Sequence, residues 1–311
     1  MSSLVLYSPS GVVAREAPLR RAARRLGALG FRVEVDEAAL ARSQRFAGDD
    51  ATRLAALHRI AAAAPDVALA TRGGYGLTRL LDRIDWPLLG RSVERGTRWV
   101  GHSDLTLLQI GLLAHGRGAA ACSWAGPLAC DDFGRSEAEG GVDDVTEACF
   151  LEGLSGELEA VGFRERSDAR GSPRFDGLEV AGPLWGGNLC LVASMLGTRQ
   201  WPARSATRGG VLFLEDVNEH PYRIERCLLQ LQGAGVLDAQ QAVLLGSFSD
   251  FRKSPLDRGY GLRSVVDHLR GLTATPVLTG LPFGHVRTKL MLPVGRRVRL
   301  LVERRNVLIG W

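Results

Sequence analysis

The first part of the chain alternates short apolar runs with longer amphipathic segments. The apolar runs resemble β-strands that end at Gly, Ser or Pro, and the segments between them repeat apolar residues at helical spacing. In order, the pieces are LVLYSPS, Ala17 to Leu29, FRVEV, Thr52 to Ala64 and DVALATRGG, followed by RWVGHSD and LTLLQIGLLAHG. This rhythm predicts βαβ units, and therefore a parallel sheet covered by helices.

The middle of the chain, from Asp131 to Gly177, is acidic, glycine-rich and weakly periodic. Such a segment is expected to hold a helix and then a crossover between domains. Strand-like and helical runs return after it and end in a predicted hairpin, RVRLLVE and NVLIGW. The predicted fold class is α/β, with a Rossmann-like N-terminal parallel-sheet domain over residues 1–135, a crossover over 136–177 and a smaller C-terminal mixed α/β domain over 178–311.

Length and composition are those of a soluble globular protein. A chain of 311 residues can bury a sizeable core without disulfide or metal support. Its 45% hydrophobic and 23% charged residues are close to globular averages, and no apolar run approaches the roughly 18 residues of a membrane span. The start, MSSLVLYSPSGVV, lacks the features of an export signal, so it is predicted to be a first strand. We therefore expect no membrane partner.

Cysteine usage and charge argue against several other classes of site. The five cysteines are scattered and form no C-x-x-C pair, which disfavours a disulfide framework and a zinc site and fits a reducing cytoplasm. The formal charge is +5, but 37 of the 39 basic residues are arginines spread among 34 acidic residues. Because no basic run is interleaved with aromatic residues, we expect no nucleic-acid partner.

The segment WVGHSDLT contains the first candidate catalytic residue, Ser103, at a predicted strand-to-helix turn. Such a turn holds the serine hydroxyl outside the sheet, and the amide of Asp104 then lies at a helix N-terminus that favours an anion. The alternative is that Ser103 or Asp104 only caps the helix. Leu105 stands where the hydrolase elbow G-x-S-x-G has its second glycine, so that motif is not matched.

The second candidate element is the loop Arg72-Gly-Gly-Tyr-Gly76, which lies between the strand DVALA and the predicted helix LTRLLDRI. Its glycines allow backbone amides to approach a ligand, either to donate to an oxyanion or to hold a phosphate. The loop departs from the G-x-G-x-x-G motif, and it also departs from the phosphate loop G-x-x-x-x-G-K-[ST], since no lysine is near. A tight turn without a ligand is the alternative.

Glu215 is a carboxylate at the end of the apolar strand VLFLEDV. A buried carboxylate is costly unless it is paired, so we expect it to meet a cation, a histidine or backbone donors. Asp216 and Glu219 compete for the same role, and the whole acidic cluster could instead cap the following helix. His285 lies in the Gly- and Pro-containing loop LPFGHV, where a histidine is exposed enough to titrate and fixed enough to act.

Two further histidines, His102 and His220, stand next to candidate site residues, and a role for either of them stays open. The candidates together supply a nucleophile, a base, an acid and two amide donors. Because such triads are recognised by role and geometry, this set is compatible with several folds.

Five motifs, in order, resemble the LD-carboxypeptidase family, which includes the microcin C self-immunity peptidases. They are RGGYG at 72–76, GHSD at 101–104, WGGNL at 185–189, LED at 214–216 and PFGH at 282–285. SPSG at 8–11 and RFAG at 45–48 are also similar, so the resemblance covers nearly the whole chain.

The resemblance implies a catalytic triad of Ser103, Glu215 and His285, and an oxyanion hole made by the amides of Gly74 and Asp104. It also implies an enzyme without metal or other cofactor, an N-terminal domain carrying the serine, a C-terminal domain carrying acid and histidine, and a homodimer. The implied reaction removes the terminal D-alanine from murein tetrapeptide in cell-wall recycling.

The substrate contacts are less constrained. Arg72 or Arg287 is expected to bind the terminal carboxylate, because each is the fixed cation nearest in sequence to a site motif. Trp185 and Asn188 are expected at the substrate. A flat tryptophan face could stack on a nucleobase, which would favour a microcin-type substrate, but a tryptophan buried at the domain junction explains Trp185 equally well. An α/β-hydrolase esterase is a rival enzyme class, which the missing elbow glycine disfavours. A non-catalytic small-molecule-binding module that uses RGGYG as its cradle is the rival outside the enzymes. His102 departs from the family, in which an aromatic residue, often tyrosine, precedes the serine.

Overall fold

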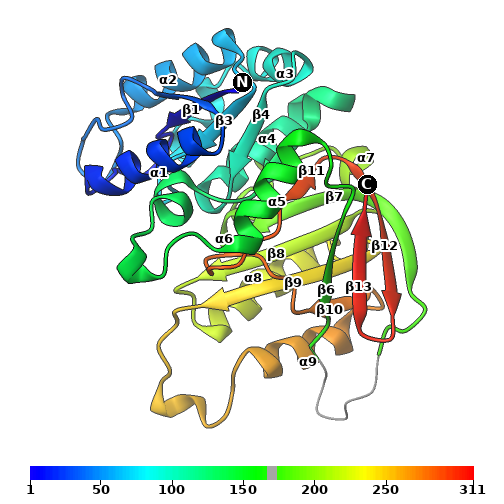
Figure 1. Cartoon of the computed structure of the whole chain (residues 1–311). Coiled ribbons are helices and arrows are strands. Elements are labelled where there is room, and N and C mark those ends of the chain that lie inside the picture. The colour runs from blue at the N-terminus through cyan, green and yellow to red at the C-terminus, as the bar shows by residue number, and fades with distance from the viewer. Residues whose placement is uncertain (167–173) are drawn as a thin grey trace.

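The computed structural model describes residues 1–166 and 174–311, and in this part the chain forms two sheets with flanking helices (Figure 1). The first sheet has the strand order β11-β5-β4-β3-β1-β2. Strands β1 to β5 are parallel, and β11 pairs antiparallel with β5. Its strands are β1 (Ser3–Tyr7), β2 (Arg32–Val35), β3 (Val67–Ala70), β4 (Arg98–Gly101), β5 (Ser123–Ala125) and β11 (Leu292–Val294).

Helices cover both faces of the first sheet, as a parallel sheet requires. They are α1 (Glu16–Ala28), α2 (Asp50–Ala63), α3 (Trp86–Glu94) and α4 (Thr106–His115). The helix expected over LTRLLDRI does not form; the segment makes two 3-10 turns, at Leu77–Arg79 and Leu81–Arg83. Asp85 caps α3 immediately afterwards by accepting from the Leu88 amide, so the segment is too short for a separate α-helix.

The second sheet is mixed, with the order β10-β9-β8-β7-β12-β13-β6 in the described residues. Strands β7 to β10 are parallel, while β12, β13 and β6 are antiparallel to their neighbours. Its strands are β6 (Ala160–Arg164), β7 (Glu179–Asn188), β8 (Val211–Val217), β9 (Ala242–Ser249), β10 (Val277–Thr279), β12 (Arg297–Glu303) and β13 (Asn306–Gly310). The remaining helices are α5 (Asp144–Ser155), α6 (Leu189–Ser194), α7 (Arg204–Thr207), α8 (Pro221–Gly233) and α9 (Leu262–Leu272).

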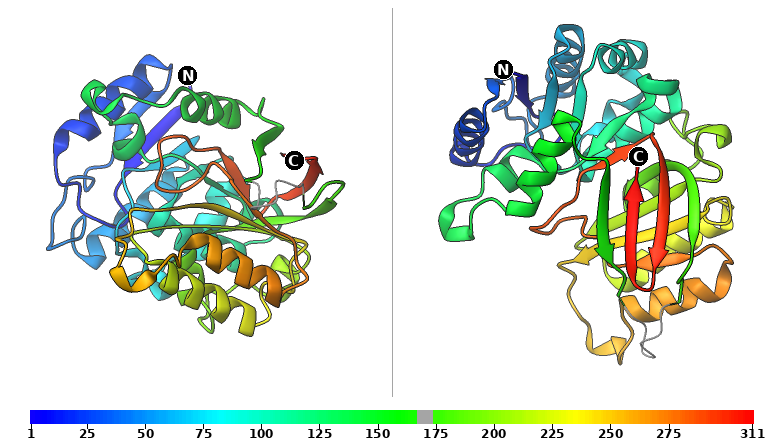
Figure 2. Two further views of the ribbon diagram at one scale, coloured as in Figure 1. Left: turned by 90° about the horizontal axis from the view of Figure 1, so that it is seen from below. Right: turned by 45° about the vertical axis from the view of Figure 1, so that its right-hand side comes forward.

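The two halves exchange short segments instead of meeting at a clean boundary. Strand β6, inside the predicted crossover 136–177, pairs with β13 in the second sheet, whereas β11, from the C-terminal region, returns to the first sheet (Figure 2). Buried side chains of α4 and of the second sheet share one hydrophobic cluster, which includes Leu107 of α4 and Leu212 of β8. The α/β expectation with two domains is confirmed, and the halves share part of their core.

Candidate active site

Ser103 occupies a strained turn between β4 and α4. Its φ of 61° is in the left-handed region, which costs a non-glycine residue about 1–2 kcal/mol. A 3-10 turn at Ser103–Leu105 then leads into α4, and neither Ser103 nor Asp104 caps that helix. Instead, the Asp104 carboxylate accepts from the Leu77 amide at 2.8 Å. Strain at a serine between a strand and a helix is the geometry of a nucleophile elbow, although the second elbow glycine is absent.

Ser103, His285 and Glu215 form one continuous chain of hydrogen bonds. His285 Nδ1 lies 2.8 Å from Glu215 Oε2, and His285 Nε2 lies 3.0 Å from Ser103 Oγ. Because a carboxylate only accepts, the Nδ1–H of the histidine donates to Glu215, which leaves Nε2 of the neutral ring to accept from the serine hydroxyl. The serine comes from the first sheet and the other two from the second, so the two halves of the chain meet at this point.

The two histidines beside Ser103 have opposite electrostatics. Burial lowers the pKa of His285, but the hydrogen bond and charge of Glu215 outweigh burial and leave this pKa raised. Burial, followed by the charges of Lys289 and His285, brings the pKa of His102 well below its usual value. His102 Nδ1 donates to the Gly126 carbonyl at 2.9 Å, and its ring packs edge-on against His285. His102 is therefore a buried, neutral neighbour of His285.

The carboxylate of Glu215 is fully buried and is held from behind by Asn188. The Asn188 side-chain amide donates to Glu215 Oε1 at 3.3 Å and to Asp216 Oδ1 at 2.8 Å. Burial raises the pKa of Asp216 to about 6, and the nearby charge of Glu215 acts in the same direction. Asn188 is itself buried and joins two carboxylates, and its expected contact with the substrate stays a prediction. Glu219 pairs with Arg223 outside this network.

The glycine loop after β3 lies directly against the serine. A Cβ built on Gly73 would be 2.5 Å from Ser103 Oγ, so only glycine allows the loop to approach this closely. Gly74 has a φ of 97°, which again favours glycine. Over residues 1–166 and 174–311, the amides of Gly74 and Asp104 donate to no protein acceptor. Two amides next to the serine thus remain available to a ligand.

The other predicted contact residues are dispersed. Arg72 is half-buried and donates to the Val12 carbonyl, whereas the exposed Arg287 donates to the Gly140 carbonyl. Trp185 is fully buried, donates to Gln240 Oε1 at 2.9 Å and packs against another tryptophan ring. This burial fits the alternative of a tryptophan packed at the domain junction, and a contact of Trp185 with the substrate stays a prediction.

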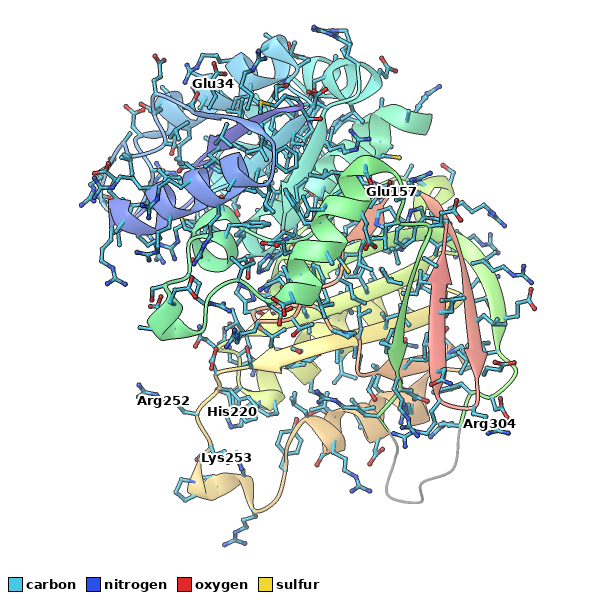
Figure 3. All side chains as sticks on the ribbon, viewed as in Figure 1. Glu34, Glu157, His220, Arg252, Lys253 and Arg304 are labelled. Carbon is cyan, nitrogen blue, oxygen red and sulfur yellow. The ribbon has the colours of Figure 1, made fainter. Side chains whose placement is uncertain are left out.

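His220, left open by the sequence, contacts residues outside the triad. It begins α8, with Nε2 3.2 Å from Asp257 Oδ2, and packs near Phe251 in the segment that carries Arg252 and Lys253 (Figure 3).

A buried ion pair behind His285 was not predicted from the sequence. Lys289 is 2% exposed, and its Nζ lies 2.6 Å from Asp132 Oδ1. The same ammonium donates to the Val286 carbonyl, next to His285, while Asp132 also accepts from the Leu128 amide. The pair ties the histidine loop to the turn after β5. Its only sequence signal is a lysine in an arginine-dominated chain.

No group of three or more His, Cys, Asp or Glu residues in the described segments could hold a metal ion. Those segments also contain no helix with the length and apolar character needed to cross a membrane.

Comparisons with known proteins match both halves of the chain. The family models for the N-terminal and C-terminal domains of LD-carboxypeptidases match residues 5–121 and 181–300. The murein tetrapeptide carboxypeptidase of Pseudomonas aeruginosa is 30% identical over 302 residues, covering 94% of this chain and 91% of that protein. The crystal structure of muramoyltetrapeptide carboxypeptidase from Oxalobacter formigenes superposes with a TM-score of 0.85 at 37% identity, covering 100% of this chain and 99% of that one.

A solved structure of the microcin C7 self-immunity protein has a TM-score of 0.84 at 19% identity, covering 100% of this chain and 96% of that one, which shows a shared fold. The resemblance noted in the sequence motifs is confirmed by these matches. The chain belongs to the LD-carboxypeptidase family and is a serine-type carboxypeptidase.

Proposed function

We propose that this carboxypeptidase releases the terminal D-alanine of murein tetrapeptide in cell-wall recycling, with Ser103 as nucleophile, His285 as general base and Glu215 as the residue that orients the histidine. The observation that carries the proposal is the hydrogen-bonded chain from Ser103 through His285 to the buried Glu215. The names of the relatives from Pseudomonas aeruginosa and Oxalobacter formigenes support the substrate.

In the proposed mechanism, His285 accepts the proton of Ser103 as Oγ attacks the carbonyl carbon of the scissile amide. The resulting imidazolium is stabilised by Glu215 and gives its proton to the nitrogen of the departing D-alanine as the C–N bond breaks. Water then attacks the acyl-enzyme ester, with His285 again accepting a proton, and the shortened peptide leaves with a new carboxylate while Ser103 is restored.

The amides of Gly74 and Asp104 form the oxyanion hole of this mechanism. Both flank the serine, and neither donates to a protein acceptor within the described residues. Donors that are fixed before the reaction stabilise the developing negative charge without reorganisation, and one such donor contributes on the order of 10²–10³ in kcat.

Arg72 is the better candidate of the two arginines for binding the terminal carboxylate. Its guanidinium donates to Val12 and lies beside Gly11, which packs on the Gly73–Gly74 backbone next to Ser103. Arg287 instead extends toward the Gly140 carbonyl. A charged, planar donor group near the scissile bond suits a carboxylate.

Trp185 supplied the reason to consider a nucleotide-peptide substrate, and its complete burial removes that reason. We retain the homodimer and the cytoplasmic location as part of the proposal. The five cysteines are free thiols, which supports a reducing compartment. Light scattering on the purified protein tests the dimer.

The test of the proposed function is release of D-alanine from purified murein tetrapeptide, followed by liquid chromatography and mass spectrometry. Ser103→Ala should lower turnover by about 10⁴-fold or more and abolish labelling by a fluorophosphonate, while Ser155→Ala, an exposed serine on α5, should match the wild type. Labelling without tetrapeptide cleavage would leave a serine hydrolase with another substrate, such as an ester. Ser103-independent cleavage would refute the mechanism.

A further inference from the structure

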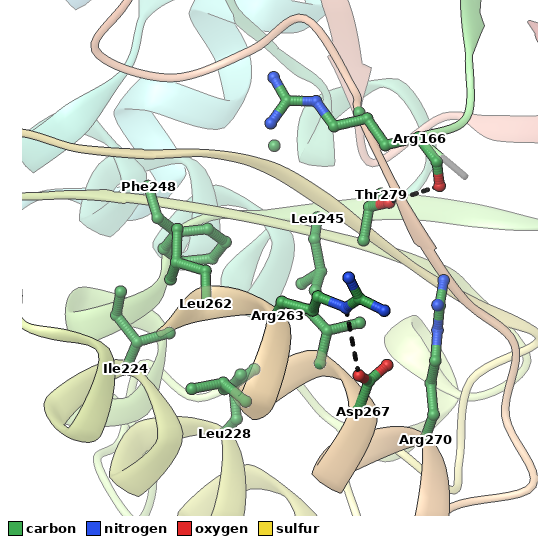
Figure 4. A pocket seen from close by; sticks show the side chains of 14 residues that line it. Arg166, Ile224, Leu228, Leu245, Phe248, Leu262, Arg263, Asp267, Arg270 and Thr279 are labelled. Atoms are coloured by element: carbon green, nitrogen blue, oxygen red, sulfur yellow. Dashed lines mark hydrogen bonds and ion pairs between the residues drawn. The ribbon is translucent and has the colours of Figure 1, made fainter. Parts of the chain in front are cut away.

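A cavity of about 280 Å³ opens between α8, α9 and the strands β9 and β10 (Figure 4). Three elements supply its apolar lining. The lining residues are Ile224 and Leu228 of α8, Leu245 and Phe248 of β9, and Leu262 and Val265 of α9. These side chains belong to the helix-covered side of the second sheet, whereas Glu215 follows Phe213 on the other side, by strand alternation. The cavity is therefore separate from the Ser103 site.

Three arginines border one side of this cavity: Arg166, Arg263 and Arg270. Arg270 is paired with Glu165 at 3.1 Å. Arg263 lies at 3.8 Å from Asp267 on the exposed surface of α9, a separation that contributes little binding energy. Arg166 is exposed and has no ion-pair partner in the described residues. An anionic group at this border would thus meet the guanidinium groups of Arg166 and Arg263.

We propose that this cavity is a binding site for an amphipathic organic anion, with an apolar tail between α8, β9 and α9 and a carboxylate or phosphate at Arg166 and Arg263. Apolar walls with a few convergent polar groups are typical of small-molecule sites. At about 30 Å³ for a water-sized group, the volume accommodates roughly nine such groups. A medium-chain carboxylate such as octanoate has the matching size and charge.

The cavity also adjoins the backbone that holds the proposed acid and base. Gly246 lines it, and a Cβ on the opposite side of this glycine would be 3.4 Å from the Glu215 Cβ and 2.6 Å from the Phe283 carbonyl. Thr279 and Gly280 line it as well, directly before the loop that carries His285. An occupant would therefore contact both segments, so its binding should change kcat. This second step rests on the proposed function.

Calorimetry with octanoate on the full chain tests the site independently of catalysis. We expect saturable one-to-one binding, weaker binding of octan-1-ol, which has the tail without the charge, and none of acetate. Val266→Trp, which fills the cavity from its α9 wall, should weaken octanoate binding by about tenfold or more. Arg166→Ala should weaken it by about fivefold, while Arg297→Ala, an exposed arginine on β12, should leave it unchanged.

If a Val266→Trp variant whose fold is verified by circular dichroism bound octanoate with wild-type affinity, the proposed site would be overturned. Binding of octan-1-ol as tight as that of octanoate, or no saturable heat on titration with octanoate, would overturn it as well. If Val266→Trp does not fold, Leu262→Trp serves as the filling variant. Saturating octanoate should change kcat in the wild type and leave it constant in the filled variant. Binding without any change in kcat would overturn the coupling to the active site and leave the binding site standing, whereas an inactive enzyme that still binds octanoate would refute only the proposed function.

Discussion

Replacing Glu215 by Gln should remove nearly all peptidase activity while the protein stays folded. The 2.8 Å hydrogen bond places the carboxylate beside the imidazolium that forms as Ser103 attacks. Two opposite charges about 4 Å apart attract by about 4 kcal/mol at an effective dielectric constant of about 20. At 1.36 kcal/mol for each factor of ten, losing this attraction lowers kcat by about three orders of magnitude.

The position of Asn188 adds a second effect to this variant. Its side-chain amide donates to Glu215 Oε1, so a glutamine at position 215 would turn its carbonyl oxygen toward Asn188 and its NH₂ group toward His285. His285 Nδ1 would then accept, and the ring proton would move to Nε2, facing Ser103. A histidine in this tautomer cannot accept the serine proton, so a loss of about 10⁴-fold is expected, as for other triads with the wrong tautomer.

The assay is kcat/KM for D-alanine release, measured for Glu215→Gln beside Glu215→Asp and Glu219→Gln. Glu215→Asp keeps the charge and should retain more activity than Glu215→Gln, although its shorter side chain lengthens the hydrogen bond. Glu219→Gln removes a nearby carboxylate that pairs with Arg223, so it should behave as the wild type. If Glu215→Gln kept about a tenth or more of the wild-type kcat/KM, the assigned role of Glu215 would be refuted.

Three further results are expected. The Ser103→Gly variant should be more stable than Ser103→Ala by about 1 kcal/mol of unfolding free energy in urea titrations, because only glycine adopts the positive φ at this position without strain. Equal free energies of unfolding would contradict this strain. kcat/KM should rise with pH through the raised pKa of His285, because this histidine must be neutral to accept the serine proton. The His102→Tyr variant should be active and should keep the same rise of kcat/KM with pH; if the rise disappeared in this variant, His102 would be the base. Lys289→Met should cost up to about 3–5 kcal/mol of unfolding free energy, because it removes the 2.6 Å partner of the buried Asp132 and leaves only Arg135, 4.0 Å away, as its cation. Adding Asp132→Asn should restore most of this loss, and no restoration would argue against the buried pair.

The sequence predicted the residues that meet at the site because they share a simple position. Ser103 and the histidine loop follow apolar parallel strands, and Glu215 lies in the last part of another, β8; the carboxyl ends of such strands collect functional groups. The competition between burial and the charge of Glu215 for the pKa of His285 could not be decided from the sequence. It depends on a 2.8 Å contact between residues 70 positions apart.

Sequence interpretation was weakest at residues whose neighbours in the sequence are not their neighbours in space. Trp185 precedes two glycines of a site motif, but strand register pairs it with Leu212, on the helix-covered side of the second sheet. Asn188 is in register with Glu215, which places its side chain within hydrogen-bond distance of the two carboxylates. The Lys289–Asp132 pair joins residues 157 positions apart, and no periodicity in the chain indicates such a contact.

The geometry of the triad depends on how closely α4 approaches the end of β7. Thr106 lies in the first turn of α4 after the serine, and its hydroxyl oxygen accepts from the backbone amide of Asn188 at 3.0 Å. A Cβ on Gly187 would lie 2.4 Å from the same hydroxyl oxygen of Thr106. A side chain at Gly187 would therefore separate the element that carries Ser103 from the strand whose end braces Glu215. Since the serine comes from one sheet and the acid and base from the other, the Ser103–His285 hydrogen bond exists only when this contact is closed. Gly187 of the WGGN motif is thus explained by the docking of the two halves, whereas a Cβ on Gly186 would lie 1.9 Å from the Phe213 carbonyl oxygen of the neighbouring strand β8.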